Sequence, residues 1–401
     1  MQEIRADDGG VMTSPALLVQ EFVHLYGSGD NEIRTFFAPG RVNLIGELID
    51  YNGGLVMPAA IALGITAACR LRSDHLVRLR SSDDPLAVEV DLNQPIEFDP
   101  ARGWGNYPAG VLRELVLRGE DLMGADVLFT TTLPQGAGLS SSAALEVLTA
   151  FSFLALAHAP LGDLKTIALF CQKVENQFVG VNCGIMDQFA VALCRQDHAL
   201  LLDCDSQDFT HIPVTLGAYA LVIMNTSRQR RLAESKYNER RAECEAVLQL
   251  LGTDAPYNGL VHAEWSDVLS HVADPVLRRR ARHVITEHKR VKQASQALAS
   301  GDLATFGRLL DESHTSLRDD YEVTGPYLDA VVSAAQQAPG CLGARMTGAG
   351  FAGCAIALVK QADLPAFTVS VRSAYLAATG LEPSFYVTQA VDGVHEVTGK
   401  A

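Results

Sequence analysis

The sequence lacks long apolar runs, an excess of basic residues and a secretory leader. No apolar run approaches the length that crosses a bilayer, and the N-terminus carries Asp7 and Asp8 in place of an apolar core. The formal net charge of −15 argues against nucleic acid or an anionic membrane surface as the main partner, because both favour basic surfaces. We therefore expect a cytoplasmic protein that binds neither.

Two common functional motifs are also missing. The eight cysteines show no Cys-x-x-Cys spacing and lie mostly in apolar contexts, which indicates reduced, buried thiols and not a zinc site. No Gly-x-x-x-x-Gly-Lys-Ser/Thr motif occurs, so a Walker-type NTPase is not expected. What remains is a globular composition, with 401 residues and 48% hydrophobic content, long enough for two domains with substantial cores.

Residues 134–143, Pro-Gln-Gly-Ala-Gly-Leu-Ser-Ser-Ser-Ala, carry the clearest functional pattern. Glycines let backbone amides approach an anion, and the first turn of a following helix adds unpaired N–H groups and a positive dipole end. The apolar residues after Ala143 predict that helix, in which Glu146 suits the dipole of the first turn. The pattern favours a phosphate-binding loop, although an ordinary capped turn has the same composition.

Residues 41–54 place Arg41, Glu47 and Asp50 among apolar residues beside glycines. Buried charge is costly unless it is paired, so the segment indicates a polar site, the alternative being a surface hairpin. Before it, the pattern predicts a helix over residues 15–27 and a strand over 34–38 that ends in a turn at Pro39-Gly40.

Residues 175–189 form a third segment, in which a helix-like stretch leads into a glycine turn. Glu175 and Asp187 flank this turn. Phosphoryl transfer needs one acid on a metal ion and another near the acceptor hydroxyl, because the reaction depends on positioning and electrostatics. The spacing allows this division of roles, although either acid alone is usually just solvated.

Residues 343–354 form a fourth, glycine-rich segment. Its Gly-x-Gly-x-x-Gly spacing, from Gly348 to Gly353, matches the dinucleotide fingerprint, but the strand-like run 355–359 follows where that fingerprint needs a helix. We therefore expect a loop of close backbone approach and reject a Rossmann fold. The basic run 278–282 is interpreted as a solvated helix face.

With these four segments in place, the chain closely resembles the galactokinases, part of a family of small-molecule kinases that also includes homoserine, mevalonate and phosphomevalonate kinases. The sugar signature is matched over residues 40–52 except at Leu48 and Ile49, and the glycine-rich motif over 345–354 except at Ala352. The nucleotide loop is matched over residues 134–143 and the acidic segment over 175–188. Further matches lie at residues 104–107, 235–241 and 313–321.

The resemblance implies an α+β fold of two domains with the active site in the cleft between them. Residues 1–215 would contain the sugar signature, the phosphate loop and the catalytic acid, and residues 216–401 would bring the glycine-rich motif to close the cleft. The implied reaction is ATP-dependent transfer of the γ-phosphoryl group to the anomeric hydroxyl of galactose, which gives α-galactose 1-phosphate.

The resemblance also implies roles for individual residues. Asp187 would lie against the 1-hydroxyl and take its proton or orient it, and Arg41 would pair with Asp187. Ser142 and Glu175 would hold Mg²⁺. The implied sugar-binding residues are Glu47, Leu48, Asp50, Gly184 and Tyr237. The implied nucleotide-binding residues are Trp104, Tyr107, Gly136, Ala137, Gly138, Leu139, Ser140, Ser141 and Ser142.

Leu48 is the main departure from the family pattern, which usually has histidine there. Loss of that side chain would weaken galactose binding by about 1–3 kcal/mol or favour a sugar without the 6-hydroxyl. The alternatives are therefore a kinase for fucose, arabinose or N-acetylgalactosamine, or a catalytically silent sugar and ATP sensor. Ala352 adds a methyl group where backbones approach closely. The resemblance further suggests a monomer.

Overall fold

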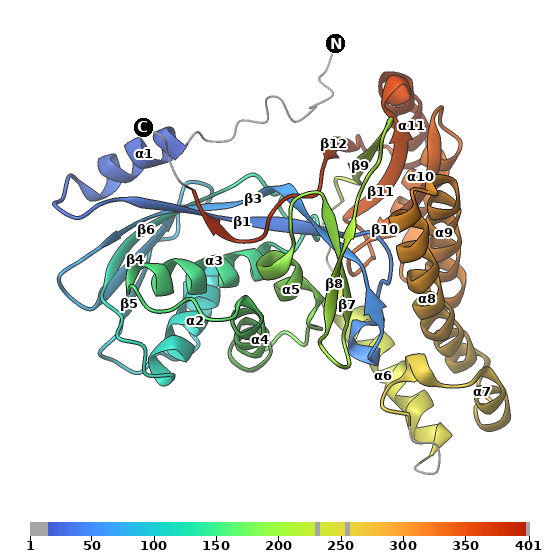
Figure 1. The fold of residues 1–401 in the computed structure, drawn as a ribbon, viewed down its shortest axis with the longest axis horizontal. Coiled ribbons are helices and arrows are strands. Elements are labelled where there is room, and N and C mark those ends of the chain that lie inside the picture. Colours follow the sequence, from blue (N-terminus) through green and yellow to red (C-terminus); the bar gives the residue numbers. More distant parts are fainter. Residues whose placement is uncertain (1–14, 229–232, 253–256, 398–401) are drawn as a thin grey trace.

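The computed structural model describes residues 15–228, 233–252 and 257–397, and its first sheet is mostly antiparallel (Figure 1). In spatial order this six-stranded sheet consists of β13 (His395–Glu396), β1 (Arg34–Asn43), β3 (Pro58–Leu71), β6 (Ala125–Thr131), β4 (Leu76–Ser81) and β5 (Val88–Asp91). Only the β4–β6 pair is parallel. This order differs from the parallel sheet of a Rossmann fold, whose rejection is thereby confirmed.

Helices cover both faces of the first sheet (Figure 1). One face carries α1 (Pro15–Tyr26), and the other carries α2 (Asn106–Leu117), α3 (Ser141–Leu156), α4 (Leu164–Val174) and α5 (Met186–Leu193). Since side chains alternate along a strand, Ala68 of β3 packs with Leu18 and Phe22 of α1, while its neighbours Ala67 and Cys69 join the main core. The predicted helix over residues 15–27 is confirmed.

The predicted turn at Pro39-Gly40 is wrong. Strand β1 continues through both residues, and only its register against β3 shifts between them. A Cβ on Gly40 would lie 2.5 Å from Leu133 Cδ2 and 2.7 Å from the Leu139 carbonyl oxygen. The glycine therefore allows the phosphate loop to approach the strand closely, which is a role that local turn chemistry does not reveal.

A second sheet and a layer of helices form the other end of the molecule (Figure 1). Its strands, in spatial order, are β10 (Cys341–Thr347), β11 (Cys354–Lys360), β9 (Tyr219–Asn225) and β12 (Ser384–Thr388). The helices of this part are α6 (Ala233–Leu251), α7 (Trp265–His271), α8 (Pro275–Ser300), α9 (Leu303–Ser316), α10 (Gly325–Gln336) and α11 (Leu364–Thr379). The run 355–359 is the buried centre of β11, as predicted.

A small third sheet is formed by strands of the first part of the chain and packs against α8 of the second. It pairs β2 (Leu55–Val56) with β7 (His198–Asp203) and β7 with β8 (Phe209–Pro213). The predicted boundary near residue 215 falls between β8 and β9 and stays a prediction, and the last strand, β13, returns to pair with β1. Short helices are 3₁₀ segments at Asp50–Asn52, Pro100–Gly105, Leu260–His262 and Gln361–Asp363, and π-helical turns at Glu175–Val179 and Leu317–Tyr321.

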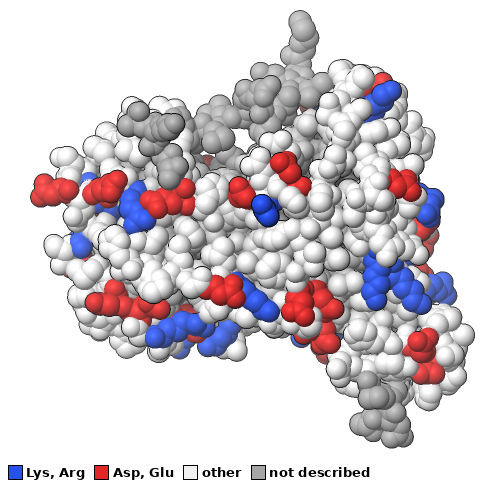
Figure 2. Space-filling model, viewed as in Figure 1, with Lys and Arg blue, Asp and Glu red and all other residues white. Residues whose placement is uncertain are grey.

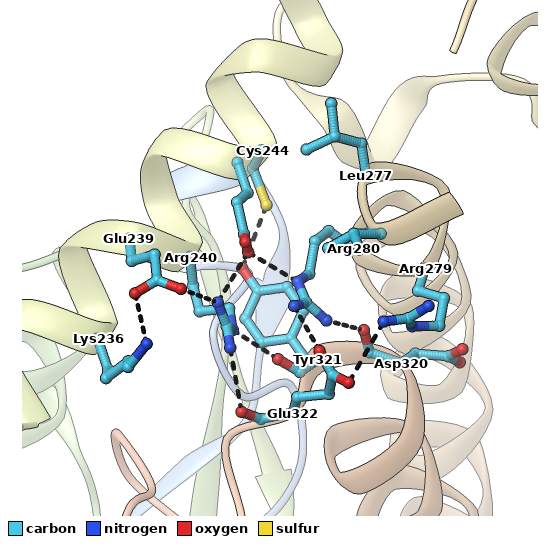
Figure 3. A network of polar contacts seen from close by, with 12 residues as sticks. Lys236, Glu239, Arg240, Cys244, Leu277, Arg279, Arg280, Asp320, Tyr321 and Glu322 are labelled. Atoms are coloured by element: carbon cyan, nitrogen blue, oxygen red, sulfur yellow. Dashed lines mark hydrogen bonds and ion pairs between the residues drawn. The ribbon is translucent and has the colours of Figure 1, made fainter. Parts of the chain in front are cut away.

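The basic run 278–282 is only partly a solvated face, so that interpretation is wrong for Arg280. This side chain is 2% exposed, and its guanidinium donates to Glu243 Oε2 at 2.7 Å and Glu322 Oε2 at 2.6 Å (Figure 3). Arg240 donates to the Tyr321 carbonyl oxygen at 2.7 Å in the same network. These hydrogen bonds and ion pairs therefore connect α6 with α8 and with the π-helical turn Leu317–Tyr321.

The surface carries mixed charge on the face shown in Figure 2, with a group of basic side chains at the right over the C-terminal helices. Over the residues that the structure describes, no helix combines the length and the apolar character needed to span a membrane. The eight cysteines are all free, five of them buried and three partly exposed, which agrees with the expectation of reduced thiols.

Ala352 lies in a conformation that residues with a Cβ avoid, since its φ is 151° and its side chain is buried. We expect Ala352→Gly to raise the free energy of unfolding by about 1 kcal/mol, because relief of about 1–3 kcal/mol of backbone strain exceeds the entropic cost of glycine. Urea and thermal unfolding measure the change. Ala355→Gly, at a buried position inside β11, is the control and should destabilise. Equal destabilisation by both would contradict the strain at Ala352.

Candidate active site

One pocket gathers the predicted catalytic pair and the predicted sugar-binding residues. It is lined by Arg41, Glu47, Leu48, Asp50, Cys183, Gly184, Met186, Asp187, Tyr237, Gly348 and Ala349. These residues come from the sugar signature, the acidic segment, α6 and the glycine-rich motif. Cys183, Met186, Gly348 and Ala349 were not predicted individually, although all of them lie within segments that the sequence had marked.

Arg41 and Asp187 form a two-pronged ion pair in this pocket. Arg41 Nε and Nη2 each donate to one Asp187 oxygen at 2.8 Å, and Nη1 donates to the Gly138 carbonyl oxygen at 2.8 Å. The Arg41 side chain is 5% exposed and that of Asp187 27%. A planar guanidinium holds a carboxylate in one orientation, so the acid faces the pocket while the arginine also contacts the phosphate loop.

Asp50 begins the 3₁₀ turn Asp50–Asn52 and lines the same pocket. Burial, followed by the negative charge of Asp187, raises the pKa of Asp50 to about 6. Gly184 lies so close that a Cβ there would be 1.7 Å from Asp50 Oδ2. The glycine therefore provides the space that this carboxylate occupies.

Tyr237 of α6 lines the same pocket. Its ring contacts that of Tyr51 edge-on, with centroids 5.3 Å apart, and the Tyr51 hydroxyl lies 2.7 Å from the Tyr321 hydroxyl. The Tyr321 hydroxyl also contacts Cys244 Sγ at 3.2 Å (Figure 3). A chain of contacts among partly or fully buried aromatic side chains thus positions Tyr237 relative to the turn that contains Asp50.

Glu47 and Leu48 both line the pocket but make different contacts. Both Glu47 oxygens accept hydrogen bonds from the protein: Oε1 from Gly348 N and from Thr347 Oγ1 at 3.2 Å, and Oε2 from Asn43 Nδ2. Leu48 is 5% exposed, has a φ of 63° and presents an apolar side chain to the pocket. Glu47 therefore ties the loop to the glycine-rich motif, and Leu48 forms an apolar wall.

A second pocket collects part of the predicted nucleotide-binding set. Of that set, Trp104, Tyr107, Gly136, Ser141 and Ser142 line it. Pro134 and Gln135, from the predicted loop, and Leu145, from the helix after it, also line it, although they were not predicted individually. The other lining residues are ones that the sequence did not reveal: Ile65, Ser81, Asp83, Asp84, Phe129, Thr130, Thr131 and Leu133. Most of these lie at or just beyond the ends of β4 and β6, which meet only because the two strands pair, and no local pattern marks them.

The remaining residues of the predicted set, Ala137, Gly138, Leu139 and Ser140, do not line this pocket. The Leu139 carbonyl oxygen accepts from Arg41 N at 3.1 Å, so this part of the loop faces β1. Gly136, Gly138 and Ser140 have φ values of 67°, 73° and 64°. Such alternation turns backbone amides toward a common side and, with the start of α3, makes an anion-binding arrangement.

Ser142 and Glu175 lie together, as a shared magnesium site requires. A hydrogen bond from Ser142 favours the charged Glu175, while burial acts more strongly and raises the pKa of this carboxyl. Glu175 opens the π-helical turn Glu175–Val179, a form often found at functional sites. Mg²⁺ prefers few protein oxygens together with water and phosphate, so a hydroxyl and a carboxylate fit it. Within the described ranges no group of three or more His, Cys, Asp or Glu could hold a metal ion.

The expected role of Glu146 at the helix dipole is wrong. Its side chain is fully buried against the acidic segment, where burial and the charge of Glu175 raise the pKa of Glu146 well above its usual range. Helix α3 is buried on all sides from Ala143 to Leu154, so Glu146, one turn after Ser142, has no face open to solvent.

The fold and site define a class of small-molecule kinases. Residues 106–195 match the family model of the GHMP kinases N terminal domain, and residues 294–376 match that of the GHMP kinases C terminal. Residues 20–71 match the galactokinase galactose-binding signature. The architecture is therefore the mixed α+β fold of the GHMP kinases, as the resemblance implied.

Relatives narrow this class. The chain is 46% identical to a galactokinase of Clostridium tetani over 95% of this chain and 97% of that protein, and 46% identical to one of Enterococcus faecalis over 95% and 99%. The crystal structure of Lactococcus lactis galactokinase complexed with galactose superposes with a TM-score of 0.92 at 40% identity, covering 96% of this chain and 100% of that one. The chain belongs to the galactokinase family.

A more distant structure shows the fold alone. Methanococcus jannaschii mevalonate kinase is 18% identical and covers 91% of this chain and 99% of its own, with a TM-score of 0.63.

Gly184→Ala tests the space beside Asp50. The added methyl group would displace the carboxylate, so we expect sugar affinity to fall by about 10–100-fold, the loss of a hydrogen bond to a charged group. Calorimetric titration with galactose measures it, and ATP affinity should not change. Gly180→Ala, in the same segment, meets no atom within 4 Å but has a φ of 88°, and should lower stability alone. Equal sugar affinities in both variants would contradict this role.

Asp50→Asn tests the buried charge. Because the folded-state pKa of Asp50 is raised from 3.8 to about 6, the penalty for burying its charge grows as pH rises from about 4 to about 6 and is complete above that, reaching at most about 3 kcal/mol. We expect Asp50→Asn to stabilise the ligand-free protein more at pH 8 than at pH 5, in thermal unfolding. Asp121→Asn, at an exposed acid outside the pocket, is the control. A pH-independent gain from Asp50→Asn would contradict the raised pKa.

Proposed function

We propose that this protein transfers the γ-phosphoryl group of ATP to the anomeric hydroxyl of galactose and releases ADP and α-galactose 1-phosphate. The observation that carries the proposal is the double attachment of Arg41, which holds Asp187 in the sugar pocket and the Gly138 carbonyl in the phosphate loop. An acceptor hydroxyl at Asp187 would thereby lie next to a phosphate at the start of α3. Membership of the galactokinase family supports galactose as the acceptor.

Each residue of the site has a role in this reaction. Asp187 accepts a hydrogen bond from the 1-hydroxyl and either takes its proton or orients it, and Arg41 fixes Asp187 and stabilises the charge that develops during transfer. Backbone amides of residues 136–141 hold the β- and γ-phosphates. Ser142 and Glu175 would hold Mg²⁺, which when bound offsets the charge of the phosphates.

The two ligands are recognised by different kinds of side chain. Tyr237 and Asp50, whose carboxylate occupies the space left by Gly184, contact hydroxyls of the sugar, while Glu47 holds the sugar loop against the glycine-rich motif. The adenine base lies near Trp104 and Tyr107. Since one chain supplies the whole sugar pocket, we propose that the protein acts as a monomer. We also propose that the boundary between its N-terminal and C-terminal domains lies near residue 215. Its free cysteines and its use of ATP support a cytoplasmic location.

Leu48 favours a second candidate substrate. An apolar side chain in the pocket offers no hydrogen bond to a hydroxyl, so a sugar without the 6-hydroxyl, such as fucose, or the pentose arabinose would meet a matching surface. N-acetylgalactosamine is a further alternative, with a larger substituent elsewhere on the ring. A silent sensor would have no need of the Arg41–Asp187 pair, which is intact here.

ADP release with Mg²⁺-ATP and a sugar panel tests the proposal. We expect the highest kcat/KM with galactose among galactose, fucose, arabinose, N-acetylgalactosamine and glucose. Asp187→Asn should lower kcat by about 10²–10⁴-fold, because asparagine cannot take a proton and interrupts the ion pair, with ATP affinity retained. A preference for fucose or arabinose would reassign the substrate. ATP binding without turnover of any sugar would favour the sensor.

A further inference from the structure

Glu146 is a buried carboxyl group that the proposed reaction does not use. It lies on α3 one turn after Ser142 and is 0% exposed. Its Oε1 has no hydrogen-bond partner in the part of the chain that the structure describes, and its Oε2 lies 3.4 Å from Gln188 Nε2. A buried carboxyl group with one long amide contact is costly, so packing alone does not account for it.

Gln188 joins Glu146 to the predicted magnesium site. It follows Asp187 on α5 and is fully buried. Its Nε2 donates to Glu175 Oε2 at 2.6 Å, and Cys183 Sγ lies 3.4 Å from the same oxygen. Both contacts therefore use Oε2 of Glu175, which leaves Oε1 as the oxygen for a cation shared with Ser142.

We propose that Glu146 and Gln188 are positioning residues that hold the Glu175 carboxylate for coordination of Mg²⁺ through one oxygen. The inference rests on the proposed function. Mg²⁺ demands near-ideal octahedral geometry, which a freely rotating carboxylate would not supply. Groups that hydrogen-bond a metal ligand fix its orientation, and their loss commonly costs about 10–100-fold in metal affinity.

The raised pKa of Glu146 is consistent with this role. Burial is its main cause and the charge of Glu175 the next, and both favour the uncharged acid. An uncharged Glu146 accepts from Gln188 without adding negative charge beside Glu175. Glutamine at position 146 should therefore retain the function, because its side-chain carbonyl oxygen still accepts a hydrogen bond from Gln188. Leucine has no such acceptor.

Binding of Mn²⁺ tests the inference without turnover. Electron paramagnetic resonance measures free Mn²⁺ in titrations of the full-length protein with the non-hydrolysable analogue adenylyl imidodiphosphate. We expect Glu146→Leu and Gln188→Leu each to raise the Kd of Mn²⁺ by about tenfold, and Glu146→Gln to keep it within about twofold. The double leucine variant should bind no more weakly than Gln188→Leu, because Glu146 acts through Gln188. Galactose affinity should not change.

A matched control separates positioning from general stability. Glu114 is also a buried helical carboxylate, but it pairs with Lys173 and Arg118 and lines neither of the two pockets. Glu114→Leu should lower the Tm and leave the Kd of Mn²⁺ unchanged.

Four results would overturn the inference. Wild-type Kd values in both leucine variants would remove any positioning role, and full additivity in the double variant would remove the route through Gln188. If Glu146→Leu does not fold, Gln188→Leu and Glu146→Gln carry the test, and a tenfold loss in Glu146→Gln would contradict the acceptor role. Absence of Mn²⁺ binding by the wild-type complex would instead refute the proposed Ser142–Glu175 site itself, and this inference with it.

Discussion

The ion pair between Arg41 and Asp187 is the constraint on which the site depends. It connects β1 to the first turn of α5, and the third contact of Arg41, to Gly138, adds the loop before α3. Arg41 is almost completely buried, so removal of its partner would leave an uncompensated charge and cost about 3–5 kcal/mol. The interaction that orients the proposed catalytic acid therefore also fixes how β1, α5 and the loop before α3 pack together.

The second half of the chain positions the sugar loop through buried polar contacts. Gly46 N donates to Glu287 Oε1 at 3.0 Å, and His283 Nε2 lies 3.1 Å from the Glu47 carbonyl oxygen, so α8 holds the loop from one side. Arg345 Nη1 donates to the carbonyl oxygens of Asn43 and Leu44 and holds it from another. The shape of the proposed sugar pocket is thus set by residues about 240–300 positions away along the chain.

Local patterns in the sequence predicted what depends on local physics. The helix over residues 15–27 and the buried strand over 355–359 follow from periodicity. The resemblance grouped Arg41, Asp187 and Asp50 in one site, and the structure places all three in one pocket. Phosphate binding by the loop 134–143 stays a prediction. The turn at Pro39-Gly40 was predicted wrongly because glycine is favoured both in turns and in strands that another loop approaches closely, and the sequence alone does not distinguish the two roles. Arg280 and Glu146 were misjudged because a charged helical residue is usually solvated, and only tertiary partners reveal the exception.

Some of the non-glycine residues with positive φ lie in the segments that form or border the two pockets, while others, such as His158 and Gln207, lie elsewhere. Leu48, Ser140 and Ala352 all have positive φ, and each lies in a segment that forms or borders a pocket. Such conformations cost about 1–3 kcal/mol each and persist only where surrounding contacts leave no alternative. Two such contacts are the hydrogen bond between Glu47 and the glycine-rich motif and that between Arg41 and the loop 134–143. Phosphoryl transfer depends on positioning far more than on covalent chemistry of the protein. The free energy of folding that is lost to strain in these loops therefore favours catalysis, because it keeps the reacting groups in fixed positions.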